Sequence, residues 1–164
     1  MNAPQVSISL SLAKKRLIIK EDNTMKIKLD NGAKMPTRAH STDAGLDLYC
    51  PSLGIGAYHI PPQGSVVIDT GVHIELPIGT VGFLKSKSGL NVNHGITSEG
   101  VIDAGYTGSI QVKLYNHSDK WYTVYEGNKI SQLVILPVYL PTLEVVASLD
   151  DTERGDNGFG SSGK

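Results

Sequence analysis

The chain has 164 residues, of which 18 are glycine and only 6% are aromatic, and its formal net charge is −1. A chain of this length buries one hydrophobic core but not two of ordinary size, so we expect one compact domain. A charge this close to zero excludes recruitment of nucleic acid or of an anionic membrane by an overall positive field, so neither is an expected partner. The single cysteine, Cys50, excludes an internal disulfide and a multi-cysteine zinc site, and we expect a buried thiol there.

The first 24 residues are expected to form an extension or leader ahead of the main domain, because Met25 offers an internal start. The apolar run at 6–13 is followed by basic residues, the reverse of their order in a signal peptide. No stretch approaches the roughly 18 consecutive apolar residues that a membrane helix needs. We therefore expect a soluble, cytoplasmic protein. Residues 10–19 fit a helix and a strand equally well.

Short segments rich in β-branched residues follow along the chain, separated by turns that contain glycine and proline. The spacing predicts strands over residues 65–70, 72–76, 111–115 and 130–140. Hardly any segment has helical periodicity. We therefore predict an all-β protein, a jelly-roll-like β-barrel or sandwich over residues 25–151, followed by a flexible, glycine-rich tail over 152–164.

Two segments carry acidic residues. Asp43 and Asp47 lie four residues apart, which places them on one face if the segment is extended, and this arrangement suits a cation held through water. A solvated strand edge explains the same pattern. In the segment 100–108, Asp103 and Tyr106 lie among glycines that favour a hairpin turn. The turn itself explains the aspartate, but a carboxylate there also suits the orientation of a water, and the ring suits contact with a sugar.

Two further segments have polar groups suited to phosphate. Residues 85–90 combine two lysines, two serines and a glycine, which fits a phosphate cradle or simply a solvated basic loop. In the segment 127–133, Gln132 lies at the start of an apolar strand, and a backbone carbonyl is the expected partner of its amide.

The tail contains a Gly-x-Gly-x-x-Gly pattern at Gly158, Gly160 and Gly163. A dinucleotide-binding turn is not expected, because that pattern must follow a strand and open a helix. A mobile terminus is one interpretation of the tail. The other is a lid that becomes ordered on a nucleotide, with Arg154 binding phosphate and Phe159 stacking on a base. The five histidines show no metal-binding spacing, and we assign them structural or surface roles.

In this order, the five segments resemble the five motifs of trimeric dUTPases, from about Met25 onward. The resemblance implies a jelly-roll subunit and a homotrimer whose sites are shared between subunits. It also implies Mg²⁺-dependent hydrolysis of dUTP to dUMP and pyrophosphate, which limits uracil in DNA and supplies dUMP for dTMP synthesis.

The resemblance also implies a role for individual residues. Asp103 is the expected base for the water that attacks the α-phosphorus, Tyr106 stacks on the deoxyribose, and Asp47 holds the metal through water. Phe159 covers the uracil. The other expected substrate-binding residues are Lys87, Ser88, Gly89 and Gln132 toward the phosphates, Arg154, Ser161 and Ser162 from the tail, and Thr97, Gly100 and Gly160.

Two positions depart from the family pattern: Lys87 stands where arginine is common, and Thr97 stands where asparagine is frequent. Lysine keeps the charge but loses the bidentate fork of arginine. Two alternatives remain. One is a nucleotide-sensing regulatory or partner-binding protein with the same fold. The other is a dCTP deaminase, which is disfavoured because Lys113 stands where that group carries its catalytic glutamate.

Overall fold

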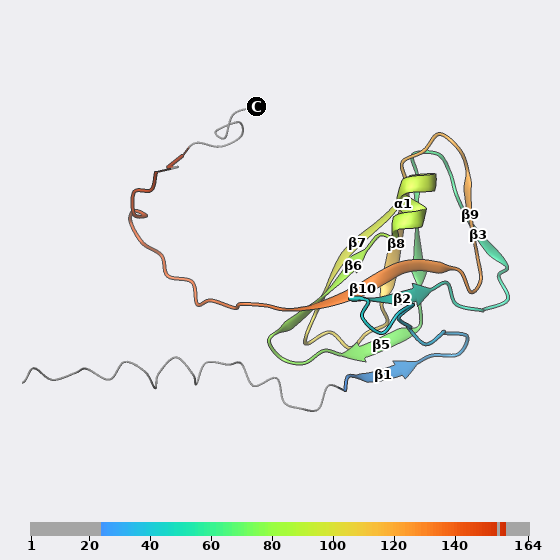
Figure 1. The fold of residues 1–164 in the computed structure, drawn as a ribbon, viewed down its shortest axis with the longest axis horizontal. Helices are drawn as coiled ribbons and strands as arrows, with labels where there is room; N and C mark the ends of the chain where they lie inside the picture. The colour runs from blue at the N-terminus through green and yellow to red at the C-terminus, as the bar shows by residue number, and fades with distance from the viewer. Residues whose placement is uncertain (1–23, 154, 157–164) are drawn as a thin grey trace, which may run out of the picture.

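The structure is a computed structural model that describes residues 24–153, 155 and 156. Its largest unit is a six-stranded sheet in which all neighbouring strands are antiparallel (Figure 1). The strands of this sheet, in spatial order, are β2 (Gly45–Tyr49), β10 (Lys129–Pro137), β6 (Thr80–Lys85), β7 (Ile96–Asp103), β8 (Gln111–Asn116) and β4 (Ser65–Asp69).

Two antiparallel ribbons complete the β-structure. One pairs β1 (Lys26–Leu29) with β5 (Val72–Glu75), and the other pairs β3 (Ala57–Ile60) with β9 (Tyr122–Tyr125). The single helix of the described residues, α1 (Ser88–His94), connects β6 to β7.

One hydrophobic cluster joins the three sheets. In β8, exposed and buried residues alternate, as expected for a strand with one face toward the core. Its buried apolar residues, Val112 and Leu114, pack in a cluster that also contains Leu48 of β2, Ile60 of β3, Ile74 of β5 and Val124 of β9. Burial of each such side chain stabilises the fold by roughly 1.5–3 kcal/mol, so the cluster holds the ribbons against the inner face of the sheet.

The prediction of an almost entirely β chain is confirmed, and the strands predicted over 65–70, 72–76 and 111–115 agree with β4, β5 and β8 to within one residue. The strand predicted over 130–140 ends earlier, at Pro137, after which Val138 N–H donates to the Gly79 carbonyl at 2.9 Å. The pairing stops there because the partner strand β6 begins at Thr80, and Gly79 before it has a φ of 83°, which is a turn and not a strand conformation.

Helix α1 was not predicted. Glycine and two asparagines lower the helix propensity of this segment, and none of its residues is buried, so it lacks the apolar stripe that marks most helices. The helix ends at Gly95, whose φ of 67° is readily adopted only by glycine.

Residues 138–153 run away from the sheet (Figure 1). This segment exposes a series of large apolar side chains: Tyr139, Leu140, Leu143, Val145 and Leu149. The predicted boundary between the β-domain and the tail at residue 151 stays a prediction. The segment before this boundary is already separate from the core. Within the described residues, no helix has the length and apolarity to cross a membrane.

Candidate functional site

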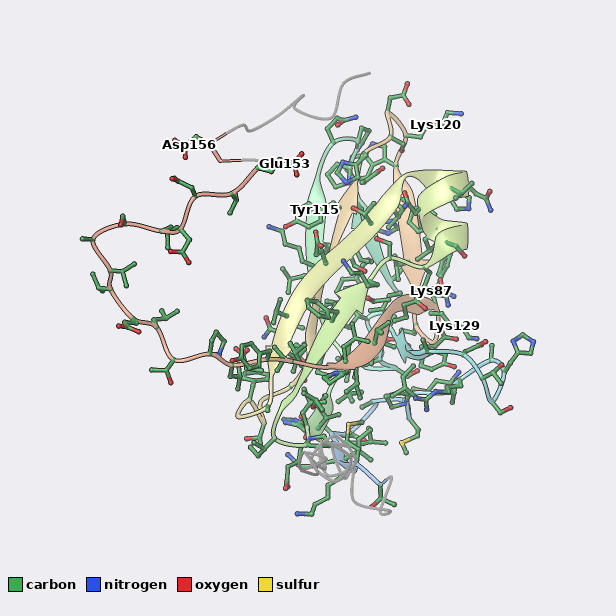
Figure 2. The ribbon with its side chains drawn as sticks, turned by 60° about the vertical axis from the view of Figure 1, so that its left-hand side comes forward. Lys87, Tyr115, Lys120, Lys129, Glu153 and Asp156 are labelled. Carbon is green, nitrogen blue, oxygen red and sulfur yellow. The ribbon has the colours of Figure 1, made fainter. Side chains whose placement is uncertain are left out.

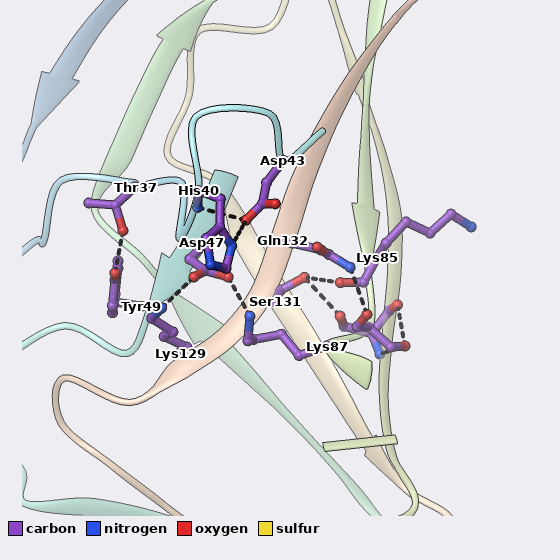
Figure 3. A network of polar contacts seen from close by, with 12 residues as sticks. Thr37, His40, Asp43, Asp47, Tyr49, Lys85, Lys87, Lys129, Ser131 and Gln132 are labelled. Carbon is purple, nitrogen blue, oxygen red and sulfur yellow. Dashed lines mark hydrogen bonds and ion pairs between the residues drawn. The ribbon is translucent and has the colours of Figure 1, made fainter. Parts of the chain in front are cut away.

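The carboxylate of Asp47 is the centre of the first candidate site. Asp47 lies on β2 and is only 5% exposed. Its Oδ1 accepts a hydrogen bond from Lys87 Nζ, and its Oδ2 pairs with Lys129 Nζ at 2.6 Å (Figure 3). Both ammonium groups also reach solvent, since their side chains are 25% and 42% exposed. A buried acid is therefore held between two lysines at the protein surface, which Figure 2 shows close together.

Opposing influences act on the pKa of Asp47. Burial raises it, but hydrogen bonds and charge from Lys129 and Lys87 outweigh burial and leave the pKa below its ordinary value. The same hydrogen bond raises the pKa of Lys129. At neutral pH all three groups are charged, so the cluster carries one net positive charge.

A β-bulge brings Lys129 to Asp47. Lys129 pairs with Tyr49 and Ser131 pairs with Leu48, so β10 has one extra residue between these pairs. In a regular strand Lys129 and Gln132 would point to opposite faces, because their separation is odd. The extra residue places both on the Asp47 side. We did not assign Lys129 from the sequence; its position beside Gln132 is the only signal, and the bulge has none.

Gln132 lies next to Asp47 in the ladder and was predicted to bind a backbone carbonyl. Its Nε2 donates to the Ser86 carbonyl at 3.1 Å, which confirms that prediction. A Cβ on Gly45 would meet Gln132 Oε1 at 2.5 Å, so the close approach of β2 to this amide requires glycine. A depression of about 370 Å³ is lined by Gln132, Gly45, Asp47, Lys87 and Lys129.

The predicted residues Ser88 and Gly89 form the first turn of α1, and both are exposed. Lys87 occupies the N-cap position, and no side chain of the described residues caps the helix. Asp43 differs from expectation, because it lies in a turn before β2, where its carboxylate accepts from the backbone N–H of His40 at 2.9 Å. Asp43 also lines the depression, but it does not share a strand face with Asp47.

A second depression, of about 600 Å³, contains the predicted residues Thr97 and Gly100 of β7. Thr97 Oγ1 and His117 Nε2 are 2.8 Å apart, and the His117 ring stacks on Tyr115. Ser86 also lines this depression, so the Ser86–Lys87 segment lies between the two hollows.

Asp103 and Tyr106 lie at the other end of β7. Asp103 ends the strand and is exposed, and its carbonyl accepts from Tyr106 N–H at 2.9 Å. The Tyr106 hydroxyl donates to the Ser109 carbonyl at 2.9 Å. A Cβ on Gly108 would meet the Tyr106 ring at 2.5 Å, so glycine lets the ring fold over the turn. The predicted hairpin turn is present, with its carboxylate open to solvent.

The strand register separates Asp103 from the first depression. Asp103 lies opposite Val81 of β6, whereas Gln132 lies opposite Lys85 of the same strand. Four residues of strand correspond to about 13 Å. One chain therefore does not bring Asp103 to the Asp47 cluster.

The remaining predictions concern metals, the thiol and the tail. Within the described ranges, no group of three or more His, Cys, Asp and Glu residues is arranged to hold a metal ion. Cys50 is fully buried, as predicted, and burial raises its pKa to about 11. Arg154, Phe159, Gly160, Ser161 and Ser162 lie outside the described residues.

Comparison with known proteins identifies the family. The dUTPase family profile matches residues 31–163. The chain is 39% identical to the deoxyuridine 5'-triphosphate nucleotidohydrolase of Kluyveromyces lactis over 145 residues, which cover 87% of this chain and 95% of the relative. It is 43% identical to the enzyme of that name from Clostridium tetani, with 86% and 97% covered.

Solved structures agree. The dUTPase of Staphylococcus bacteriophage 80alpha, in a mutant form with dUpNHpp, matches with a TM-score of 0.78 and 32% identity, over 87% of this chain and 99% of that one. A mutant dUTPase from phage phi11 of S. aureus, described with a structural Mg(II) ion, matches with a TM-score of 0.69 and 30% identity, over 77% and 98% of the two chains. These likenesses support the predicted fold class, and the chain belongs to the dUTPase family.

Proposed function

We propose that the chain hydrolyses dUTP to dUMP and pyrophosphate, the activity for which its family is named. The observation that carries this proposal is the Asp47 cluster. Two ammonium groups and an amide converge on a surface depression. The identity of the substrate, dUTP, is inferred from the family match, which covers most of the chain.

Lys87 and Lys129 bind the phosphates in this proposal. Both are held by Asp47 at the rim of the depression and keep their charge at neutral pH. Ser88 and Gly89 add a hydroxyl and backbone N–H groups from the exposed first turn of α1. Positioning and charge neutralisation dominate phosphoryl chemistry, and these groups supply both.

Both oxygens of Asp47 are paired with lysines, so in this proposal Mg²⁺ would reach the depression bound to the triphosphate. Mg²⁺ typically keeps several waters and binds one or two carboxylates together with substrate phosphates. If the phosphates draw the two lysines away, the buried carboxylate of Asp47 would accept hydrogen bonds from the waters of that metal. When bound, the metal would neutralise part of the phosphate charge.

Asp103 acts as the base. Its carboxylate orients a water and takes its proton while the water oxygen bonds to the α-phosphorus. The bond from that phosphorus to the oxygen bridging to the β-phosphate breaks, and pyrophosphate leaves. Tyr106, three residues further on, contacts the deoxyribose. The second depression, which contains Thr97 and Gly100, binds the uracil.

The site is shared between subunits of a homotrimer. Asp103 and the Asp47 cluster are too far apart in one chain to act on one triphosphate, so the cluster of one subunit serves the Asp103 of another. In this proposal, residues 138–153 form an arm that packs on a neighbouring subunit. Their exposed apolar side chains are the reason, because such a series marks an interface. In this proposal Arg154, Phe159, Gly160, Ser161 and Ser162 close over the nucleotide as a lid.

The deaminase alternative lacks its catalytic carboxylate. Lys113 is exposed on β8, with its ammonium 4.9 Å from the Tyr115 ring centroid, and an ammonium cannot act as a general base while protonated. A regulatory or partner-binding role is compatible with hydrolysis. The assay below distinguishes an active enzyme from a protein that only binds dUTP.

The test is to incubate the protein and Mg²⁺ with dUTP, dCTP, dTTP or UTP and to measure pyrophosphate and ammonia. We expect pyrophosphate from dUTP alone; ammonia from dCTP would identify a deaminase, and binding of dUTP without pyrophosphate would identify a sensor. Asp103→Asn should bind dUTP and hydrolyse it at least about 100-fold more slowly. Deletion of residues 154–164 should abolish most activity and leave the thermal unfolding curve unchanged.

A further inference from the structure

His73 of β5 connects two parts of the molecule that the sequence does not relate. Its Nδ1 is 2.9 Å from the carbonyl oxygen of Thr107, in the turn between Asp103 and Gly108. Its Nε2 is 2.8 Å from Asp30 Oδ2, in the turn after β1. The His73 side chain is only 19% exposed, whereas both of its partners are exposed to solvent.

Both partners of His73 are hydrogen-bond acceptors. A neutral imidazole has one N–H and satisfies only one of them, whereas an imidazolium donates to both. The second oxygen of Asp30 pairs with Lys28 Nζ at 3.0 Å, so the carboxylate stays ionised. When the ring loses a proton, the carboxylate retains the remaining N–H because the charge-assisted bond is stronger, and the Thr107 contact is lost.

The Thr107 contact controls the turn that carries the proposed base. The far end of this turn is fixed to the core, since Ile110 N–H donates to the Val72 carbonyl at 2.8 Å and the Ser109 hydroxyl bonds to Asp69. The hydrogen bonds of Tyr106 stay within the turn itself. His73 therefore anchors the middle of the turn, next to Tyr106.

We propose that His73 is a positioning residue for dUTP hydrolysis: as an imidazolium it bridges Asp30 and Thr107 and holds the Asp103–Gly108 turn in its active arrangement. This inference rests on the proposed role of Asp103. It predicts that kcat falls as pH rises through the titration of His73, with little change in KM for the metal-bound triphosphate.

The surrounding charges favour the imidazolium. The hydrogen bond to Asp30 and then that to Thr107 raise the pKa of His73, against opposing effects of burial and of Lys28. The bridged form therefore predominates below this raised pKa and is lost above it. The charged groups on the elements packed around His73 are Lys26 and Lys28 of β1, Asp30, Glu75 of β5, Asp103 at the start of the turn, and Asp69 of β4, which accepts from the Ser109 hydroxyl.

The test compares the full-length wild type with His73→Gln and with a control, His59→Gln, which alters a histidine of the β3–β9 ribbon bound to Thr123. We expect kcat of His73→Gln at pH 6 to be about tenfold below wild type, well inside the roughly 100-fold cost of a 1 Å misplacement. The ratio should approach one above the His73 pKa measured in the titration below, because the wild type then has a neutral ring. His59→Gln should follow the wild-type profile.

A second measurement follows the bridge without turnover. By NMR, the His73 ring and the Gly108 amide, which follows the Thr107 carbonyl, should titrate with one pKa in the wild type. In Asp30→Asn that pKa should fall, and the alkaline loss of kcat should move with it. A purely structural role would lower kcat equally at all pH values.

Different results overturn different claims. A kcat ratio of wild type to His73→Gln that stays constant from pH 6 to 9, or a Gly108 amide that does not titrate with His73, refutes the positioning role. Failure of the wild type to release pyrophosphate from dUTP refutes the proposed function, and the NMR titration still decides whether the bridge exists.

Discussion

Two buried serines, Ser98 of β7 and Ser131 of β10, link three strands beneath the candidate phosphate site. Their hydroxyl oxygens are 2.8 Å apart, and Ser131 Oγ donates to the Lys85 carbonyl of β6 at 3.1 Å. Both residues are at most 4% exposed. Ser131→Ala removes both hydrogen bonds without adding bulk, so it isolates the contribution of the hydroxyl.

The structure sets the magnitude. A neutral hydrogen bond contributes about 1 kcal/mol net, so the loss of two should lower the free energy of unfolding by about 2 kcal/mol. Ser98→Ala removes one bond and should cost about 1 kcal/mol. The double variant should cost about 2 kcal/mol rather than 3, because both single variants lose the same Ser98–Ser131 bond.

Thermal unfolding at one fixed protein concentration measures these differences, since assembly makes Tm depend on concentration. For a chain of this size, about 2 kcal/mol corresponds to a fall in Tm of roughly 4–8 °C. Ser65→Ala is the control, because Ser65 is exposed on β4. It should stay within about 0.5 kcal/mol of the wild type.

Two results would refute the reasoning about these serines. If the free energy of unfolding of Ser131→Ala lies within about 0.5 kcal/mol of the wild-type value, the hydroxyl bonds contribute nothing that water does not supply. If the effects of Ser98→Ala and Ser131→Ala simply add, the two side chains do not interact.

Other predictions test packing and reactivity. Gly82→Ala should destabilise the fold by about 1–3 kcal/mol, because a Cβ there would come within 2.9 Å of a core leucine, whereas Gly105→Ala, which meets nothing within 4 Å, should cost far less in the same unfolding experiment. Gly45→Ala should lower the free energy of unfolding by about 1 kcal/mol, because it displaces the Gln132 amide from the Ser86 carbonyl, and should raise KM for dUTP severalfold; an unchanged KM would exclude this amide from substrate binding. Cys50 should not react with a thiol reagent at pH 8 until the protein unfolds, because burial raises its pKa to about 11 and only the thiolate is reactive; fast reaction of the native protein would contradict that burial.

Much of the fold could be predicted because its determinants are local. Alternation of apolar and polar residues indicated β5 and β8 almost to the residue, since a strand with one buried face needs only period two, and β-branched residues between two glycines indicated β4. Helix α1 had no such signal, because none of its residues is buried and nothing enforces an apolar period. The end of β10 at Pro137 follows from the start of its partner β6 at Thr80, whereas the apolar residues beyond Pro137 continued the strand pattern.

The candidate site shows the same division. The family resemblance implied a metal role for Asp47 and phosphate roles for Lys87 and Gln132, and the structure places the three around one depression of a single chain. Lys129 required a β-bulge, and a bulge depends on the register of two paired strands rather than on either one alone.

The sequence by itself determined the β class, the single core, the buried cysteine and the motifs by which the family is recognised. Those features depend on composition and on neighbours along the chain. Only the tertiary structure decided that Asp47 holds two lysines, that Asp103 lies about 13 Å along the strand from that cluster, and that His73 reaches Thr107. Each of these features relates residues that are tens of positions apart in the sequence. Such relations follow from strand pairing and register, which no local pattern encodes.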